Sequence, residues 1–347
     1  MADNREAPHS DTANEKGERP VAKVFIGARS ILDLPGPHWD LLHNAGLELA
    51  PPLDIYRPLT EQEIIDNIDD VVAFVAGSDN FTERVFAAHP QLKIVARVGV
   101  GYDQVDVDAA TRHGVWVTIT PGANNDTVAD YAMAMILAVA REVVGHAAIA
   151  RDGGFHRIQG VDVCNKTLGI LGLGRIGKSV ARRASGFNMR VLAYDVMWDD
   201  AAAQALGVEF AEPEALFAES DFISVHLPST PETVKFVNAP LLARMKPSAY
   251  IVNTARGSLV DEEALVAAID AGQLAGAASD VFSVEPPPKD HPFLTHPKIL
   301  PFPHVAGVTQ ESVHAMVVMA FECIAAVVKG ERPPYPVDEQ AEYETLP

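Results

Sequence analysis

The residues whose types and spacing most clearly indicate chemistry are three glycines and one acid within residues 166–195. Gly172, Gly174 and Gly177 form a G-x-G-x-x-G pattern, and Asp195 follows them. In such a pattern the first glycine permits a tight turn, and the second lets the backbone approach a pyrophosphate. The third allows a helix to pack closely on a strand. The pattern predicts a dinucleotide-binding unit.

The acid indicates which dinucleotide is bound. Asp195 stands near the spacing of about 20 residues expected for an acid that hydrogen-bonds the adenosine ribose hydroxyls. A 2'-phosphate would be repelled by this carboxylate, and neither Val196 nor Met197 offers a cation to hold it. The sequence therefore favours NAD over NADP.

The elements that must position these residues follow the same order. Thr167–Leu171 predicts a buried strand, Lys178–Gly186 predicts the following helix, and a second strand is expected to end at Asp195. Three glycines near a strand can also form a merely structural turn. Here, however, the strand, turn, helix, second strand and acid all occur in the required order.

Before this unit, short β-branched runs alternate with helix-like segments up to Pro121. We expect strands at 23–27, 47–50, 71–77, 93–98 and 115–120, and helices at 39–44, 61–68, 82–88 and 105–113. Such alternation is typical of a mostly parallel sheet covered on both faces. One long helix over 125–151, apolar over nearly its whole surface, is expected to be buried between domains or subunits.

After Asp195 the alternation continues and completes a doubly wound sheet. Helices are expected at 213–218, 241–245 and 262–271, and strands at 222–227, 249–254, 275–282 and 299–302. Ligands of such sheets bind beyond the carboxyl ends of the strands. Those ends carry His226, Arg256, Asp280 and His304.

The length of 347 residues exceeds that of one typical domain. We expect the α/β class, with two Rossmann-like domains on doubly wound parallel sheets and a cleft between them. Residues 21–120 with 307–347 would form a substrate domain, and residues 121–306 an NAD-binding domain. A last helix over 309–328 would return to the first domain, with hinges near Pro121 and Gly307. Residues 1–20 contain almost no large apolar group and predict a flexible tail.

Composition limits the partners. Lys and Arg number 27 against 47 Asp and Glu, and the formal charge of -20 argues against nucleic acid or an anionic membrane. Only Cys164 and Cys323 are present, and both are expected to pack as thiols in a reducing cytoplasm. The most apolar stretch, 314–328, is interrupted by Glu322 and predicts a buried helix rather than a membrane span.

Seven segments in order resemble the D-isomer-specific 2-hydroxyacid dehydrogenases, nearest the phosphoglycerate dehydrogenase-like branch. They are RVGVGYDQVD (97–106), TPGAN (120–124), GLGRIG (172–177), HLPSTPET (226–233), NTARGSLVDEEAL (253–265), SDVFSVEP (279–286) and PHVAG (303–307). The resemblance covers nearly everything after residue 20. It implies an enzyme that transfers hydride between NAD and a D-2-hydroxy or 2-oxo acid. It also implies a homodimer joined through the NAD-binding domains.

In that family an Arg, a Glu and a His perform the reaction, and the resemblance assigns these roles to Arg256, Glu285 and His304. An imidazole titrates near neutral pH, so His304 could give a proton to the substrate oxygen or remove it in reverse. Glu285 would favour the protonated imidazole. Arg256 would hold the substrate carboxylate and polarise the neighbouring carbonyl.

The resemblance also implies binding residues. Asp280 would accept a hydrogen bond from the nicotinamide carboxamide, and Arg175 and Ile176 would lie over the pyrophosphate. The expected cofactor-binding set is Gly172, Gly174, Arg175, Ile176, Gly177, Asp195, His226, Pro228, Thr254, Ala255, Arg256, Asp280, His304 and Gly307. The expected substrate-binding set is Ser78, Val98, Gly99, Val100, Gly101 and Arg256. No metal is expected.

Three alternatives stay open. Phosphoglycerate enzymes commonly carry an Arg-Ser pair where this chain has Gly77-Ser78, so glyoxylate, hydroxypyruvate or a sulfonated analogue fits equally unless Arg97 or Arg29 contacts a phosphate. His226 is the rival base. The C-terminal binding proteins, which are transcriptional corepressors, share the fold and the Arg, Glu, His set, so an NAD-sensing role in protein binding is a second function class.

Overall fold

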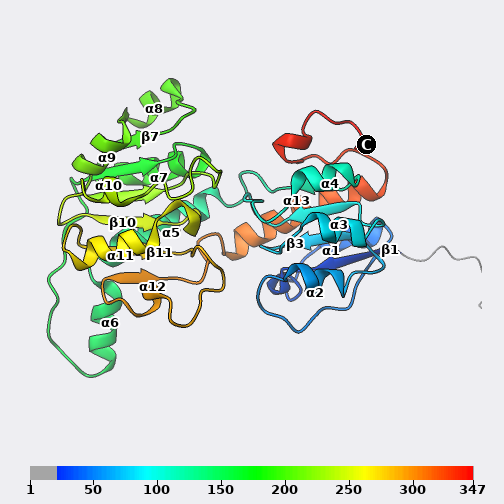
Figure 1. Cartoon of the computed structure of the whole chain (residues 1–347), viewed down its shortest axis with the longest axis horizontal. Coiled ribbons are helices and arrows are strands. Elements are labelled where there is room, and N and C mark those ends of the chain that lie inside the picture. The colour runs from blue at the N-terminus through cyan, green and yellow to red at the C-terminus, as the bar shows by residue number, and fades with distance from the viewer. Residues whose placement is uncertain (1–21, 347) are drawn as a thin grey trace, which may run out of the picture.

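The computed structural model describes residues 22–346, so the flexible tail expected at residues 1–20 lies outside the described part of the chain. The described residues form two lobes, each built on its own sheet (Figure 1). All strand pairs in both sheets are parallel. The predicted α/β class with two parallel sheets is therefore confirmed.

The first lobe holds a five-stranded sheet in the order β2-β1-β3-β4-β5. Its strands are β1 (Ala22–Ile26), β2 (Leu47–Leu49), β3 (Val71–Ala76), β4 (Ile94–Arg97) and β5 (Trp116–Thr118). Its helices are α1 (Trp39–Asn44), α2 (Glu61–Ile65), α3 (Glu83–Ala88), α4 (Val107–Arg112) and the short 3-10 helices η1 (Arg29–Ile31) and η3 (Asp338–Gln340). β3 is apolar throughout because both of its faces are covered: Phe74 packs into one core, and Ala73 and Val75 into the other.

The second lobe holds a seven-stranded sheet in the order β12-β11-β10-β9-β6-β7-β8. Its strands are β6 (Thr167–Leu171), β7 (Arg190–Tyr194), β8 (Val208–Phe210), β9 (Phe222–Val225), β10 (Tyr250–Asn253), β11 (Gly276–Ser279) and β12 (Ile299–Pro301). Its helices are α5 (Asn125–Ala140), α6 (Val143–Arg151), α7 (Arg175–Ser185), α8 (Asp200–Leu206), α9 (Pro213–Glu219), α10 (Ala239–Leu242), α11 (Glu262–Asp270) and α12 (Pro292–Thr295), with the 3-10 helix η2 (Gly257–Leu259). The strand order reverses at β6, between β7 and β9, where sheets of this type bind ligands.

The last long helix, α13 (Gln310–Val328), returns to the first lobe as predicted and packs on β3, β4 and α1. It begins at a capping box, in which the Thr309 side chain accepts a hydrogen bond from the Ser312 N–H. By length and composition α13 could cross a membrane, as could α5 and α6 if taken as one bent span. However, Val317, Phe321 and Ile324 of α13 are completely buried against the first sheet. It is a core helix.

The prediction of one long helix over 125–151 is wrong. The chain forms α5 and α6, which meet at an angle of 64°. The break lies at Glu142, whose φ of 51° is left-handed. No proline or glycine marks this point in the sequence, so the apolar pattern runs across it. The two helices also differ in burial: α5 is a core helix, whereas α6 has no buried residue.

Smaller predictions need correction as well. α7 begins at Arg175 rather than Lys178, so the helix starts inside the glycine pattern. α8 and β8 were not predicted, although Asp199 caps α8 and Gly207, with a φ of 66°, ends it. Cys323 is buried as expected, but Cys164 is exposed and is not a packing thiol.

Candidate active site

The three glycines of the turn between β6 and α7 differ in the space that surrounds them. A side chain at Gly172, whose φ is 94°, would have its Cβ 2.7 Å from the His226 backbone. At Gly177 an added Cβ would lie 2.0 Å from the Gly172 carbonyl oxygen, so the helix packs directly on the turn. At Gly174 nothing lies within 4 Å. The open space at the helix N-terminus, where Arg175 and Ile176 begin α7, suits a pyrophosphate.

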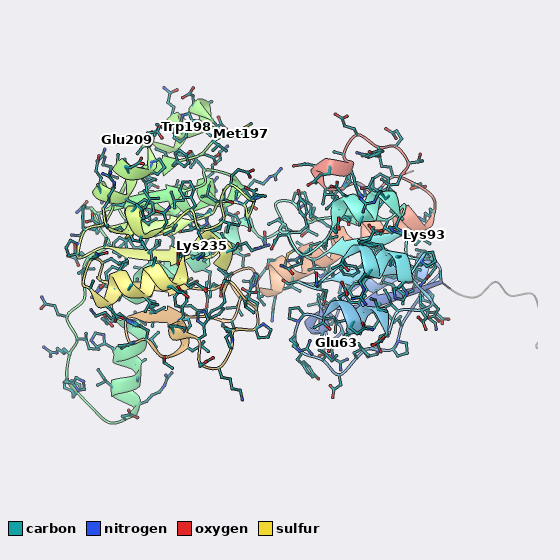
Figure 2. The ribbon with its side chains drawn as sticks, viewed as in Figure 1. Glu63, Lys93, Met197, Trp198, Glu209 and Lys235 are labelled. Carbon is teal, nitrogen blue, oxygen red and sulfur yellow. The ribbon has the colours of Figure 1, made fainter. Side chains whose placement is uncertain are left out.

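Asp195 directly follows β7, and its side chain contacts the backbone of the glycine turn. Its carboxylate accepts hydrogen bonds from the backbone N–H of Leu173 at 2.7 Å and of Met197 at 2.8 Å. A carboxylate has about four acceptor positions, so two remain for ribose hydroxyls. The residues that follow are apolar and exposed: Met197 is 83% exposed, and Figure 2 shows it beside Trp198 at the rim of the second lobe.

Four polar side chains occupy the carboxyl edge of neighbouring strands, as the sequence predicts. His226 follows β9, Arg256 follows β10, Asp280 follows β11 and His304 follows β12. These four strands are adjacent in the sheet. Because the strands are parallel, their carboxyl ends meet at one edge and bring the four residues to the same side of the lobe.

His304 and Glu285 form a pair at this edge. The Nδ1 atom of His304 lies 2.7 Å from Oε2 of Glu285, while Oε1 of Glu285 accepts from the Phe282 N–H at 3.0 Å. Burial alone would raise the pKa of Glu285, but the hydrogen bond and charge of His304 hold it below its usual value. Bonding through Nδ1 leaves Nε2 as the nitrogen that can face a substrate.

The backbone of His304 is in a conformation that L-residues rarely adopt, with a φ of 56°. Asp280 holds it there. The Asp280 carboxylate accepts from the N–H groups of Val305 at 2.9 Å and Ala306 at 2.7 Å, and its carbonyl accepts from the His304 N–H at 2.8 Å. Burial raises the pKa of Asp280 while these donors oppose the increase. Strained backbone held by surrounding bonds is common at functional sites.

His226 is differently placed. Its Nε2 lies 2.8 Å from the Ser224 hydroxyl, and its Nδ1 is buried without a partner among residues 22–346. Burial lowers the pKa of His226 to about 3, which keeps the ring neutral. No carboxylate pairs with it among these residues, in contrast to His304. The geometry therefore favours His304 over its rival as the proton donor.

Arg256 reaches from the second lobe to the first. Its Nε donates to Oδ1 of Asp103 at 2.8 Å and its Nη1 donates to the Ala255 carbonyl at 2.7 Å. The turn that carries it is fixed by Asn253, whose side chain bonds the Ala255 N–H and the Arg256 carbonyl. An added Cβ on Gly101 would lie 1.4 Å from Nη2 of Arg256, so the guanidinium lies against this glycine and would have to move for a larger residue.

The loop 98–101 follows β4 and presents its backbone to Arg256. The Val98 N–H bonds the Ala76 carbonyl, and the Gly99 N–H bonds the Thr120 hydroxyl at 3.0 Å. The N–H groups of Val100 and Gly101 make no hydrogen bond within residues 22–346. The N–H groups of Val98 and Gly99 therefore make hydrogen bonds within the protein, whereas those of Val100 and Gly101 remain available for a substrate.

Arginines and Ser78 mark the same edge of the first sheet. Ser78 follows β3 and is partly exposed. Arg97 ends β4 and is buried, its guanidinium lying beside Gly99. Burial and the charge of Arg256 lower the pKa of Arg97 to about 10. Arg29 instead donates to the Leu53 carbonyl at 3.1 Å and lies over Tyr56.

The two crossings between the lobes lie side by side. Gly307 lies on the second crossing, and an added Cβ there would be 3.3 Å from the Asn124 side chain on the first. The remaining predicted residues are close to the strand ends: Thr254, with a buried hydroxyl, follows β10, and Pro228 is exposed after β9. The Pro228 carbonyl accepts from the Thr233 hydroxyl at 2.7 Å.

Sequence reasoning missed Asp103, Asn253 and Gly257 as parts of the site. An added Cβ on Gly257 would lie 1.9 Å from the Phe282 backbone, so the Arg256 turn packs against the segment that leads to Glu285. All three residues stand inside segments that were singled out, but their partners are distant in sequence. The sequence offers a usable signal only for Asp103, because a carboxylate two residues after Gly101 could pair with an arginine.

Comparison with known proteins identifies the family of the chain. A family model described as the NAD binding domain of D-isomer specific 2-hydroxyacid dehydrogenases matches residues 133–306. Glyoxylate reductase from Korarchaeum cryptofilum is 42% identical over 298 residues, covering 83% of this chain and 90% of that protein. D-3-phosphoglycerate dehydrogenase from Synechocystis is 38% identical over 297 residues, covering 84% of this chain and 53% of that protein.

Solved structures share the fold over the same extent. The crystal structure of the TT0316 protein from Thermus thermophilus has a TM-score of 0.82 and 37% identity, and the match covers 91% of this chain and 99% of that one. The extent and identity of these matches place the chain in a single family. It belongs to the D-isomer-specific 2-hydroxyacid dehydrogenases, enzymes with an NAD-binding domain.

Proposed function

We propose that the protein catalyses reversible hydride transfer between NAD and a small D-2-hydroxy or 2-oxo acid. The observation that carries the proposal is the His304–Glu285 pair, 2.7 Å apart, on the same sheet edge as Arg256. Carbonyl reduction needs a proton at oxygen, a group that binds the acid's carboxylate and a hydride donor. The first two are supplied by this edge of the sheet.

Each side chain has a distinct task in the proposal. His304 donates a proton from Nε2 to the substrate oxygen during reduction and takes it back during oxidation. Glu285 holds the ring through Nδ1 and stabilises the imidazolium. The Nη donors of Arg256 bind the carboxylate and polarise the carbonyl oxygen, and the free N–H groups of Val100 and Gly101 complete the site.

The cofactor proposed is NAD. Open space at Gly174, the exposed start of α7 and the carboxylate of Asp195 fit a dinucleotide with an unphosphorylated ribose. When bound, NADH supplies the hydride. We propose that it is held by the full set of residues assigned in the sequence, with Asp280 also fixing the His304 backbone.

The substrate proposed is unphosphorylated, such as glyoxylate or hydroxypyruvate. Gly77-Ser78 offers no cation, and Arg29 is directed to Leu53 and Tyr56. The glyoxylate reductase named above is 42% identical to this chain, and the phosphoglycerate dehydrogenase is 38% identical. Both facts favour the smaller acid.

We further propose that residues 21–120 with 307–347 act as the substrate domain and 121–306 as the NAD-binding domain, with hinges near Pro121 and Gly307. The enzyme would be a cytoplasmic homodimer. Its contact would include α6, whose Val143 and Val144 are 51% and 48% exposed, and Phe155, which is 92% exposed. Apolar groups in such numbers on one projecting segment are typical of an interface.

A panel assay tests the function. Purified protein is mixed with NADH, and in parallel with NADPH, and its oxidation is followed with glyoxylate, hydroxypyruvate and phosphohydroxypyruvate. We expect turnover with NADH and the first two acids. We expect kcat/KM at least about tenfold lower with the phosphorylated acid, because Gly77-Ser78 offers its phosphate no cation and Arg29 is directed to Leu53 and Tyr56. NADH binding without turnover on any acid would reject the proposal and favour the corepressor-like role.

A further inference from the structure

Asp103 is an acid in the first lobe that contacts the arginine proposed to bind substrate in the second. Its Oδ1 accepts from Nε of Arg256 at 2.8 Å, and the side chains are 30% and 24% exposed. Within residues 22–346, this is the one ion pair of 4.0 Å or less that joins the two lobes. Its side chains are less exposed than those of pairs on the lobe surfaces, such as Arg190–Glu209 at 47% and 55%.

The bond determines which edge of the guanidinium is available. Arg256 has five N–H donors, of which Asp103 takes the one on Nε and the Ala255 carbonyl takes one on Nη1. The other Nη1 donor and both Nη2 donors remain, and Nη2 lies directly over Gly101. These donors form the end of the fork, which can bind a carboxylate through two parallel bonds.

Asp103 also places a negative charge near two arginines, Arg97 and Arg256, that lie close to each other. The guanidinium of Arg97 lies beside Gly99 and that of Arg256 lies against Gly101, so two guanidinium groups border one short loop. The two charges repel each other, and the charge of Arg256 contributes to the lowered pKa of Arg97. Asp103 acts against this repulsion, and Arg256 in turn keeps the pKa of Asp103 below its usual value although burial would raise it.

We propose that Asp103 is a positioning residue that holds the Nε edge of Arg256, so that the Nη edge is directed at the substrate carboxylate above loop 98–101. The inference rests on the proposed function. If the ion pair only held the two lobes together, its removal would lower the stability of the protein but would not change substrate binding. A carboxylate that competed with the substrate for Arg256 would instead weaken substrate binding, and its removal would improve it.

The test compares Asp103→Ala and Asp103→Asn with the wild-type enzyme. KM and kcat are measured with glyoxylate, and the dissociation constants of NADH and of oxamate, an unreactive 2-oxo acid mimic, are measured by titration. We expect Asp103→Ala to raise KM and the oxamate dissociation constant by about 10- to 100-fold, because a misplaced guanidinium loses its paired bonds. NADH affinity should change by less than about twofold, since Asp103 lies in the other lobe. Asp103→Asn should recover most of the loss, because its amide oxygen can still accept from Nε.

Asp106→Ala is the matched control. Asp106 stands in the same loop, but its carboxylate caps α4 by accepting from the Ala109 N–H at 2.9 Å. Its loss should lower thermal stability and leave KM within about twofold. If Asp103→Ala fails to fold, Asp103→Ser provides the same comparison with a side chain too short to reach Nε.

The outcomes separate the two proposals. Wild-type protein that neither turns over a 2-oxo acid nor binds oxamate would overturn the proposed function and this inference together. Active wild-type enzyme with unchanged KM in Asp103→Ala would overturn the inference alone. A lower KM in both the Ala and Asn variants would also overturn it, because Asp103 would then be a competitor of the substrate.

Discussion

At the scale of single residues, His304 has two nitrogens with different partners. Nδ1 is bound by Glu285, and Nε2 is the atom left for the substrate. Replacing His304 with Ala should lower kcat by about 10² to 10⁴, the usual effect of losing a general acid. NADH affinity, measured by fluorescence titration, should remain nearly intact. A variant with normal kcat would show that the proton comes from another group.

His226 gives a prediction about pH. Its pKa is about 3 in the folded protein and 6.5 in a model peptide. Between these values the unfolded chain binds more protons, so the free energy of unfolding should fall as the pH falls. His226→Asn should reduce this slope by up to about 1.4 kcal/mol per pH unit between roughly pH 4 and pH 6.

Urea unfolding at several pH values measures the His226 slope. The same substitution at the exposed His43 controls for the loss of an imidazole in general. Equal slopes in the wild-type protein and His226→Asn would contradict the view that the buried ring stays neutral.

At the scale of elements, the glycine turn supports a matched pair of substitutions. Gly177→Ala should destabilise the protein by about 1 to 3 kcal/mol, because its Cβ meets the Gly172 carbonyl oxygen. Gly174→Ala should change stability by less than about 0.5 kcal/mol, since nothing lies near it and its φ of -72° suits alanine. It should nevertheless weaken NADH binding by at least about tenfold, because the methyl group occupies the space proposed for the pyrophosphate.

Denaturant unfolding and NADH titration of both glycine variants separate these effects. If Gly174→Ala binds NADH as well as the wild-type protein does, the backbone at this position does not face the cofactor. If Gly177→Ala is as stable as the wild-type protein, the turn relaxes more easily than its close contact implies.

At the scale of the whole molecule, α6 projects from the second lobe (Figure 1). The segment that follows folds back on it: the Ile158 N–H donates to Nε2 of His146 at 3.0 Å, and Ile158 packs near Gly145. The resulting arm exposes Phe155, which is 92% exposed within the described chain. This structure explains why the α6 part of the predicted 125–151 helix, Val143–Arg151, is not buried.

The arm predicts the oligomeric state. Phe155→Asp should convert a dimer into a monomer, because a buried charge without a partner would oppose association. Light scattering after size-exclusion chromatography distinguishes a mass of 37.2 kDa from twice that mass. Val234→Asp, at a site 49% exposed elsewhere on the same lobe, should leave the dimer intact. A wild-type monomer would reject the proposed homodimer.

Local patterns along the chain were sufficient for every strand except β8 and for most helices. β-branched runs such as Val71–Ala76 identify buried parallel strands, and the glycine pattern followed by Asp195 identifies a dinucleotide site, because these signals depend on neighbours only a few residues away. The positions of His226, Arg256, Asp280 and His304 at one edge also follow from the alternation alone, since parallel strands present their carboxyl ends together. The sequence by itself thus determined the fold class and predicted the cofactor site and the principal candidates for chemistry.

The tertiary structure decided how those candidates are used. It placed Glu285 2.7 Å from Nδ1 of His304, as the resemblance implies, left Nδ1 of His226 buried without a partner among residues 22–346, and brought Asp103 to Arg256 from 153 positions away in the chain. It also bent the helix at Glu142 without a proline or glycine to mark the place. Each of these outcomes depends on contacts between segments that are distant in sequence, and such contacts exist only once both sheets have formed and the chain has crossed between the lobes twice.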